Sequence, residues 1–312
     1  MNNRTFLITV LLLTSLSGFC QIGTTDVAAP AAPKQKEEVA VFDSTKNYLG
    51  EENVFSYEGQ ILFVLPRPKR FEQYGFYDFV PAKSNTSPYY QTSSIAYEKL
   101  KEKYFYVEKV SEYTEYSQKK YVLYLTEKDN PSNQYWYYYN PHNEHSFPFF
   151  VVSHFNYLKN RYIGKKFIIA RNYLKSHDIV TGDTIIIPNE AKMFWTATDI
   201  TIVNDDNRKL HVIVKSGNLA SCVSLDWFED ALTQDDQRRV FEKSEWDNLV
   251  ATYGFSMMQS VLSAKIKVGM PLKLLIMSWG KPDRINTASY GDQYVYGNDC
   301  VYLKGGKITS WN

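Results

Sequence analysis

Two histidines in the stretch "HNEH" have the spacing in this sequence that comes nearest to a metal site. His142 and His145 lie three residues apart, which would place both imidazoles on one side of a helix. Pro141 and the aromatic strand pattern before it put the pair in a loop instead, and no third ligand is evident. We therefore expect a solvated hairpin tip, with no metal site and no cofactor.

Nucleophilic catalysis needs a Ser or Cys with a base within reach, and the sequence contains no recognisable pair. The other histidines, His154, His177 and His211, fall in strand or turn contexts without a nucleophile elbow. Cys222 lies in "LASCVSLDWF", a pattern typical of a buried strand, where a thiol without a nearby base is a poor nucleophile. We therefore predict no catalytic residues.

Three polar residues in "NDDNRK", namely Asp205, Asp206 and Asn207, resemble the start of a calcium-binding loop. The Gly and the distal Glu of such a loop are missing. Asn and Asp also favour turns, because they tolerate left-handed backbone and bond their own main chain. A turn between two strands is the expected structure.

The stretch "YWYYYNP" is the most unusual one in the chain, and it allows two interpretations. It is either a strand with aromatic rings on both faces, or an exposed aromatic platform for a partner protein or a sugar. Tyr and Trp are enriched at binding hot spots. The candidate partner-binding residues are Tyr135, Trp136, Tyr137, Tyr138 and Tyr139.

The first residues resemble an export signal followed by a tether. Arg4 precedes the apolar run 6–16, and small residues occupy the positions before a cut between Cys20 and Gln21. We predict a signal peptide over 1–20 and a flexible linker over 21–41, which is rich in Ala, Pro and charge. Lipid attachment at Cys20 is the alternative, although the bulky residue before it is unusual for a lipoprotein signal. No later stretch is long and apolar enough for a membrane span.

Composition bounds the class of protein. The 35 basic and 34 acidic residues leave a net charge of +1, which argues against nucleic acid as a partner. A hydrophobic content of 44% allows real cores, and the 25 Tyr and 18 Phe favour strands. Cys222 and Cys300 remain after the signal is removed. We expect two buried free thiols, with a disulfide between them as the alternative.

An internal sequence similarity predicts two tandem β-rich modules, residues 42–158 and 159–229. "NYLGEENVF" resembles "RYIGKKFII", and the strand-like stretches 103–110 and 119–125 resemble 192–203 and 208–214. We align "VVSHF" with "VSLDWF" at the close of each unit. Repeats of this kind indicate similar units stacked in tandem, and short strands at this spacing suggest small barrels or sandwiches.

A third, α+β domain is expected over residues 230–312. Pro271 and Gly280 predict the start and the end of a short helix, and Pro282 prevents its continuation. Leu272, Leu275, Ile276 and Trp279 form its expected buried stripe. Three short strands follow at 293–297, 300–304 and 307–311.

The segment 246–312 resembles the BamE/SmpA family of small bacterial outer-membrane lipoprotein domains. The residues that carry the resemblance are Ile266, Gly269, Met270, Gly280, Pro282, Tyr294, Tyr296, Gly305 and Gly306. With Pro271 and Trp279, these are the residues expected to define the fold. The resemblance implies a two-helix, three-stranded antiparallel domain outside the cytoplasm, used for protein contacts and not for catalysis.

The expected fold is therefore mainly β, with two small barrel-like or sandwich-like modules followed by a BamE-like domain. Our first hypothesis is an exported bacterial envelope protein, periplasmic, outer-membrane-associated or secreted, that binds or scaffolds other proteins without catalysis. One alternative is an envelope enzyme acting on cell wall or glycan. Another is a carbohydrate-binding protein that uses the Tyr-rich arm.

Overall fold

The structure is a computed structural model, and it describes most of the chain after residue 40. The described residues are 41–82, 94–115, 117–170, 173–178, 181, 183–188, 193–202, 210–229, 237–289 and 291–312. The predicted signal peptide with Cys20 and Gln21 lies outside them, as does the predicted linker except for its last residue. The structure is mainly β, with several antiparallel sheets and a curled half-barrel. Among the described residues, none of the helices has the length and apolar character to cross a membrane.

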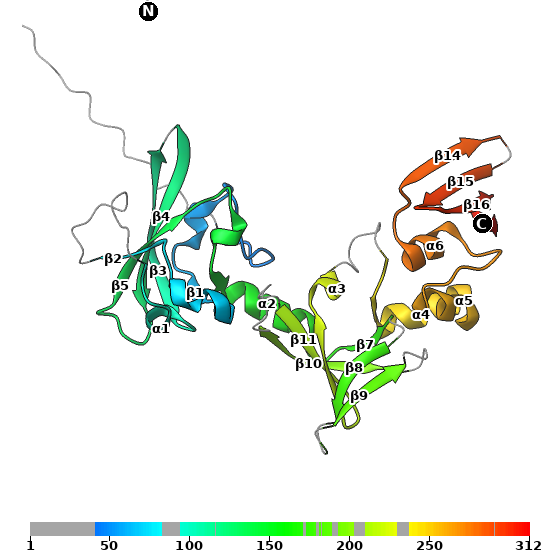
Figure 1. Ribbon diagram of the computed structural model, residues 1–312, viewed down its shortest axis with the longest axis horizontal. Helices are drawn as coiled ribbons and strands as arrows, with labels where there is room; N and C mark the ends of the chain where they lie inside the picture. Colours follow the sequence, from blue (N-terminus) through cyan, green and yellow to red (C-terminus); the bar gives the residue numbers. More distant parts are fainter. Residues whose placement is uncertain are drawn as a thin grey trace, which may run out of the picture. The chain divides into compact units, whose positions relative to one another are not determined.

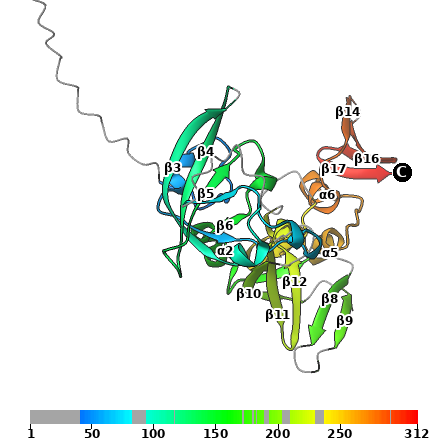
Figure 2. The same cartoon turned by 60° about the vertical axis from the view of Figure 1, so that its left-hand side comes forward.

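The first sheet has six antiparallel strands in the order β2-β5-β4-β3-β1-β6. The long β3 and β4 form a curved hairpin at its centre (Figures 1 and 2). Short helices connect the other strands. The elements are η1 (Val54–Tyr57), β1 (Ile61–Val64), η2 (Lys69–Tyr74), β2 (Phe79–Pro81), α1 (Tyr97–Leu100), β3 (Tyr104–Glu115), β4 (Gln118–Glu127), β5 (Gln134–Tyr139), η4 (Glu144–Ser146) and β6 (Phe149–Val151).

The second sheet has seven strands in the order β13-β7-β10-β11-β12-β8-β9. All its pairs are antiparallel. Helix α2 (Val152–Tyr162) connects it to the first sheet. Its elements are β7 (Lys166–Ile169), β8 (Tyr173–Asp178), β9 (Thr184–Pro188), β10 (Trp195–Ile202), β11 (Leu210–Ser216), β12 (Leu219–Ser224), α3 (Asp226–Glu229) and β13 (Val240–Glu242).

The two sheets share a strand order and a local hydrogen-bond pattern. Strands β5-β4-β3-β1-β6 correspond in chain order and in pairing to β12-β11-β10-β7-β13. The amide of Gly59 donates to the carbonyl oxygen of Val107 at 2.8 Å, and the amide of Gly164 donates to that of Ala197 at 2.9 Å. Both glycines have positive φ, and both acceptors lie at a register shift in the partner strand.

This correspondence differs from the expected alignment of the repeat. Tyr57 and Gly59, and not the earlier "NYLG", occupy the places of Tyr162 and Gly164 before the first sheet strand. Strand β6 runs directly into α2 just as β13 runs directly into α4 (Lys243–Tyr253). The segment "VVSHF" therefore corresponds to residues 242–246 and not to "VSLDWF".

The C-terminal part consists of helices packed on a four-stranded sheet in the order β14-β15-β16-β17. Helix α4 leads through Gly254 into α5 (Phe255–Leu262), and α6 (Leu272–Trp279) follows. The strands are β14 (Arg284–Ala288), β15 (Gly291–Tyr296), β16 (Asp299–Lys304) and β17 (Lys307–Trp311). Three of them were expected. Strand β14 was not, because its residues are mostly exposed and it is defined by pairing with β15.

The fold-defining residues lie where the helix signals require them. Helix α6 begins after Pro271 and ends before Gly280, as predicted. Its buried side chains are Leu274, Leu275, Met277 and Ser278. Of the expected stripe, Leu275 is buried, and Leu272 and Trp279 are partly buried against the same core. Trp279 is half-buried, and its indole Nε1 donates to the carbonyl oxygen of Ala264 at 2.9 Å.

The other residues of the resemblance contribute to the same core or to turns. Met270 and Tyr294 are buried, and Tyr296 packs edge-on against Trp279. Tyr296 also donates its hydroxyl proton to the carbonyl oxygen of Gly280. Gly269 has φ 84°, and Pro282 lies between α6 and β14.

Two of the expected domain boundaries, at 158/159 and 229/230, do not separate independent sets of elements. The boundary at 158/159 lies inside α2. Strand β13, which the sequence assigned to the third domain, pairs with β7 of the second sheet.

Candidate functional site

The aromatic run forms strand β5, and its rings divide between the two faces of the sheet. Tyr137 and Tyr139 are buried in the core of the first sheet, and Tyr135 packs at the edge of that core. Trp136 and Tyr138 point to the opposite face and are half-buried. Alternation of side chains along a strand explains the division. Only Trp136 and Tyr138 of these five therefore lie on the far side of the sheet from the core.

The inward tyrosines hold two loops onto the sheet. The Tyr137 hydroxyl donates to the carbonyl oxygen of Ser146 at 2.7 Å, and the Tyr139 hydroxyl donates to that of Gly50 at 2.9 Å. Burial raises the pKa of both phenols well above their usual value, so they stay protonated donors. Their role is structural.

A set of aromatic rings covers the face of the sheet opposite the core, which we call the outer face. It consists of Tyr106, Tyr113, Tyr124, Trp136 and Tyr138. Trp136 packs edge-on against Tyr124, with ring centroids 5.8 Å apart. Tyr138 packs edge-on against Tyr113 at 6.1 Å. The ammonium of Lys109 lies 5.8 Å from the Tyr124 ring centroid. The outer face is therefore aromatic, and Lys109 adds a positive charge beside Tyr124.

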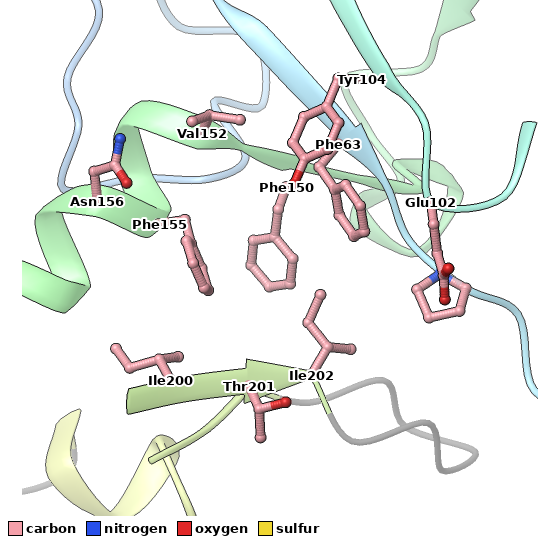
Figure 3. Close-up of a pocket in the computed structure, with 11 residues that line it drawn as sticks. Phe63, Glu102, Tyr104, Phe150, Val152, Phe155, Asn156, Ile200, Thr201 and Ile202 are labelled. Atoms are coloured by element: carbon pink, nitrogen blue, oxygen red, sulfur yellow. The ribbon is translucent and has the colours of Figure 1, made fainter. Parts of the chain in front are cut away.

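A cavity of about 480 Å³ lies beside α2, between the end of the first sheet and strand β10. Figure 3 shows the rings of Phe155, Phe150 and Phe63 beside one another, across the cavity from Ile200 and Ile202. The remaining lining residues are Pro66, Glu102, Tyr104, Val152, Asn156 and Thr201. The volume and the mainly apolar lining fall in the range of small-molecule sites.

Glu102 lies at the edge of this cavity in an uncommon backbone conformation. Its φ is 57°, and its amide donates to the carbonyl oxygen of Val64 at 3.2 Å. The lysines on either side are already in ion pairs, Lys101 with Glu98 and Lys103 with Glu127. Within the described part of the chain, no cation pairs with the Glu102 carboxylate.

A second hollow, of about 380 Å³, gathers titratable groups. It is lined by His145, His154, Glu144, Asp226 and Glu229 together with apolar side chains. His154 is buried, and its Nδ1 lies 2.9 Å from the carbonyl oxygen of Ser44. A carbonyl can only accept, so Nδ1 carries the proton and donates it. Burial lowers the pKa of His154, which keeps the ring neutral near pH 7.

The two histidines of "HNEH" lie in an exposed turn. His142 Nδ1 lies 3.1 Å from Glu51 Oε1, and His145 lies within the short helix η4, between Glu144 and Ser146. Both histidine side chains are exposed. Over the residues that the structure describes, no three His, Cys, Asp or Glu side chains are grouped to hold a metal ion.

The remaining candidates are scattered. Cys222 and Cys300 are free thiols. Cys222 is exposed in β12 and Cys300 is half-buried, so the expectation of two buried thiols is wrong. Partial desolvation raises the pKa of the Cys222 thiol, which weakens it as a nucleophile. His211 lies in β11. Asp205, Asp206, Asn207 and the side chain of His177 lie outside the described residues.

The cavity residues were missed by sequence reasoning, although one signal could have found them. Residues 151–162 and 242–253 match at a constant offset in a serine, an aromatic residue, a leucine and a tyrosine. The aromatic pair is Phe155 and Trp246. Aligning on this helix would have shown that the end of the first sheet recurs in the second.

Comparison of the chain with models of protein families, with curated proteins and with solved structures gave no match.

Proposed function

We propose that this chain is an exported bacterial envelope protein that binds a protein partner through its outer face, without catalysing a reaction. The observation that carries this proposal is the placement of Trp136, Tyr138 and Tyr124 on the face of the first sheet that the core does not use.

The outer face has the composition of a protein-binding surface. A soluble sheet usually places polar residues on its solvent side, whereas here Tyr106 is 38% exposed and Trp136 is half-buried. Tyr and Trp dominate binding hot spots, because a rigid ring buries much area with little entropy cost. The pairs Tyr124–Trp136 and Tyr113–Tyr138 are edge-to-face. That geometry offers no coplanar row for sugar rings, so a glycan partner is less favoured.

The architecture we propose is a tandem repeat that ends in a BamE-like domain. The shared strand order and the matching bonds of Gly59 and Gly164 support a duplication. The helices and the sheet after residue 243 support the resemblance in part: they comprise α4, α5 and α6 and four strands, one helix and one strand more than it implies. Export through residues 1–20 and an envelope location rest on the signal pattern and on that resemblance.

Site-specific photocrosslinking in intact cells tests the proposal. A benzophenone amino acid is placed at Trp136 in one variant and at Trp311 in a matched variant, because Trp311 is also a strand tryptophan and is 45% exposed. We expect discrete crosslinked proteins from position 136 and none of the same size from 311. Failure of position 136 to give any product in a folded, exported protein contradicts the proposal.

A second candidate function, an envelope hydrolase, is favoured by one observation. The hollow that contains His154 also contains Glu144, Asp226 and Glu229, and a neutral histidine near carboxylates has the protonation state of a general base. The test compares the wild type with His154→Asn in hydrolysis of purified cell wall. Turnover that is lost in the variant would establish this candidate, and turnover equal in both would reject this site.

A further inference from the structure

Several apolar residues that line the first cavity correspond in position to residues of the second sheet that belong to a closed hydrophobic core. Phe63 pairs with Phe150 and with Tyr104 across adjacent strands. In the second sheet, Ile168 pairs with Phe241 in the same way. The correspondence between the strands and helices of the two sheets then matches Tyr104 with Phe194, and Phe155 with Trp246.

In the second sheet this patch is covered. Ile168, Phe241 and Trp246 belong to one core with side chains from α5 and α6, such as Met258 and Leu275. Phe241 is completely buried there. In the first sheet Phe150 and Phe155 are only partly buried against the core that contains Ile200, and with Phe63 they line a cavity of about 480 Å³ (Figure 3). A patch that the fold fills with apolar side chains in one repeat is thus left underfilled in the other.

Such a cavity favours an apolar occupant. Rings and methyl groups that face a void lose the dispersion contacts of a packed core, and water gains few hydrogen bonds among them. The cavity lies beside α2 within a single chain, and its volume is too small for a helix, which with its side chains is about 10–12 Å wide. An unbranched alkyl chain fits the row Phe155, Phe150 and Phe63 opposite the two isoleucines.

The charge at the edge of the cavity selects the polar end of the ligand. Among the described residues that line the cavity, Glu102 is the one that carries a charge. Its carboxylate is exposed, while the adjacent Lys101 and Lys103 are already paired. The ammonium of Lys128 lies 5.7 Å from the centroid of the Tyr104 ring, whose face it engages. That contact occupies a face of Tyr104, whereas the ring of Phe63, which also lines the cavity, offers a π face that attracts a cation.

We propose that this cavity binds a small amphiphile that has an alkyl chain and a cationic ammonium group. The chain lies between the phenylalanine rings and Ile200 and Ile202, and the ammonium lies against Glu102. This ligand site is separate from the outer face and goes beyond the proposed partner binding.

Calorimetry with three ten-carbon probes tests the proposal on the purified chain below micelle concentrations. The probes are decyltrimethylammonium, decyl sulfate and decyl maltoside. We expect one molecule of decyltrimethylammonium per chain, bound at least about tenfold more tightly than decyl sulfate. Equal affinity for cation and anion, or no saturable binding of the cation, overturns the proposal.

Matched variants separate the charge from the cavity. Glu102→Gln should remove the preference for the cation and leave maltoside affinity unchanged, whereas Glu108→Gln, at an exposed position of β3, should change neither. Ile202→Trp fills the cavity and should abolish binding of all three probes; Thr198→Trp, on the same strand at an exposed position, should not. Melting curves check folding. If Ile202→Trp is folded and binds normally, or if Glu102→Gln keeps the preference, the proposal is wrong.

Discussion

Phe150 and Phe241 occupy the same position in two sheets and have different surroundings. Each lies in the edge strand just before a connecting helix and pairs with the first strand of its sheet, Phe150 with Phe63 and Phe241 with Ile168. Phe241 is fully buried, whereas Phe150 is half-buried beside a cavity. The same local structure thus produces a closed core in one case and an open site in the other.

This difference predicts unequal costs of truncation. Phe241→Ala should lower the free energy of unfolding by about 3–5 kcal/mol, because a fully packed ring is lost. Phe150→Ala should cost roughly 1–2 kcal/mol, since part of that ring already faces a void. Urea unfolding of the two variants measures both values. Equal losses of unfolding free energy in the two variants would contradict the claim that Phe241 is fully packed and Phe150 is not.

The hydroxyl of Tyr139 should stabilise the fold, and that of Tyr106 should not. Tyr139→Phe removes the bond to the carbonyl oxygen of Gly50 and should cost about 1 kcal/mol. Tyr106→Phe, on the exposed outer face, should change stability by less than about 0.5 kcal/mol. The midpoints of urea unfolding curves with an unchanged m-value measure the change in stability of each variant. A larger effect at Tyr106 would show that the two faces of the sheet are assigned the wrong way round.

Burial of His154 predicts a loss of stability in mild acid. Its pKa is lowered in the folded protein from the usual 6.5, so the unfolded chain binds the proton more readily. Stability from this group is complete above about pH 6.5 and declines as the pH falls towards the lower folded pKa. His154→Asn keeps a donor for Ser44 and should flatten this decline, whereas His145→Asn, at an exposed position, should not. Melting temperatures between pH 7.5 and 5 provide the measurement, and an unchanged slope in His154→Asn would refute the assignment.

Export predicts a defined mature N-terminus. The mass of the protein recovered from the envelope should correspond to a chain that begins at Gln21, because cleavage is expected after Cys20. A mass that retains Cys20 with attached acyl chains would instead establish the lipoprotein alternative. Retention of residues 1–20 without modification would contradict the proposed signal peptide.

Local signals in the sequence predict the ends of elements better than the faces they bury. Pro271 and Gly280 mark the limits of α6 correctly, since helix ends depend on the backbone of a few adjacent residues. The buried residues of α6 include Leu274 and Ser278, which the predicted stripe left out, whereas Leu272 and Trp279 of that stripe are only partly buried. A helix that is apolar on most sides leaves this choice to its packing partners, which lie far away in the chain.

For the candidate site, too, the local sequence predicts the element but not which side chains it buries. The sequence predicts a strand at "YWYYY", but aromatic residues at every position hide which rings face the core. The first cavity combines β1, β6 and α2 with β10, some fifty residues further along the chain. Strand β10 belongs to the other sheet and is in contact with α2, so the combination follows from tertiary packing that no short motif encodes.

The most direct test of the proposed function is the affinity of the outer face for the partner that crosslinks to position 136. The dissociation constant is measured for the wild type, for Trp136→Ala and for Trp311→Ala, with melting temperatures confirming that all three are folded. We predict that Trp136→Ala weakens binding at least about tenfold, a change of about 1.4 kcal/mol, and that Trp311→Ala binds like the wild type. Wild-type affinity in Trp136→Ala, or an equal loss in both variants, would contradict a partner site on this face.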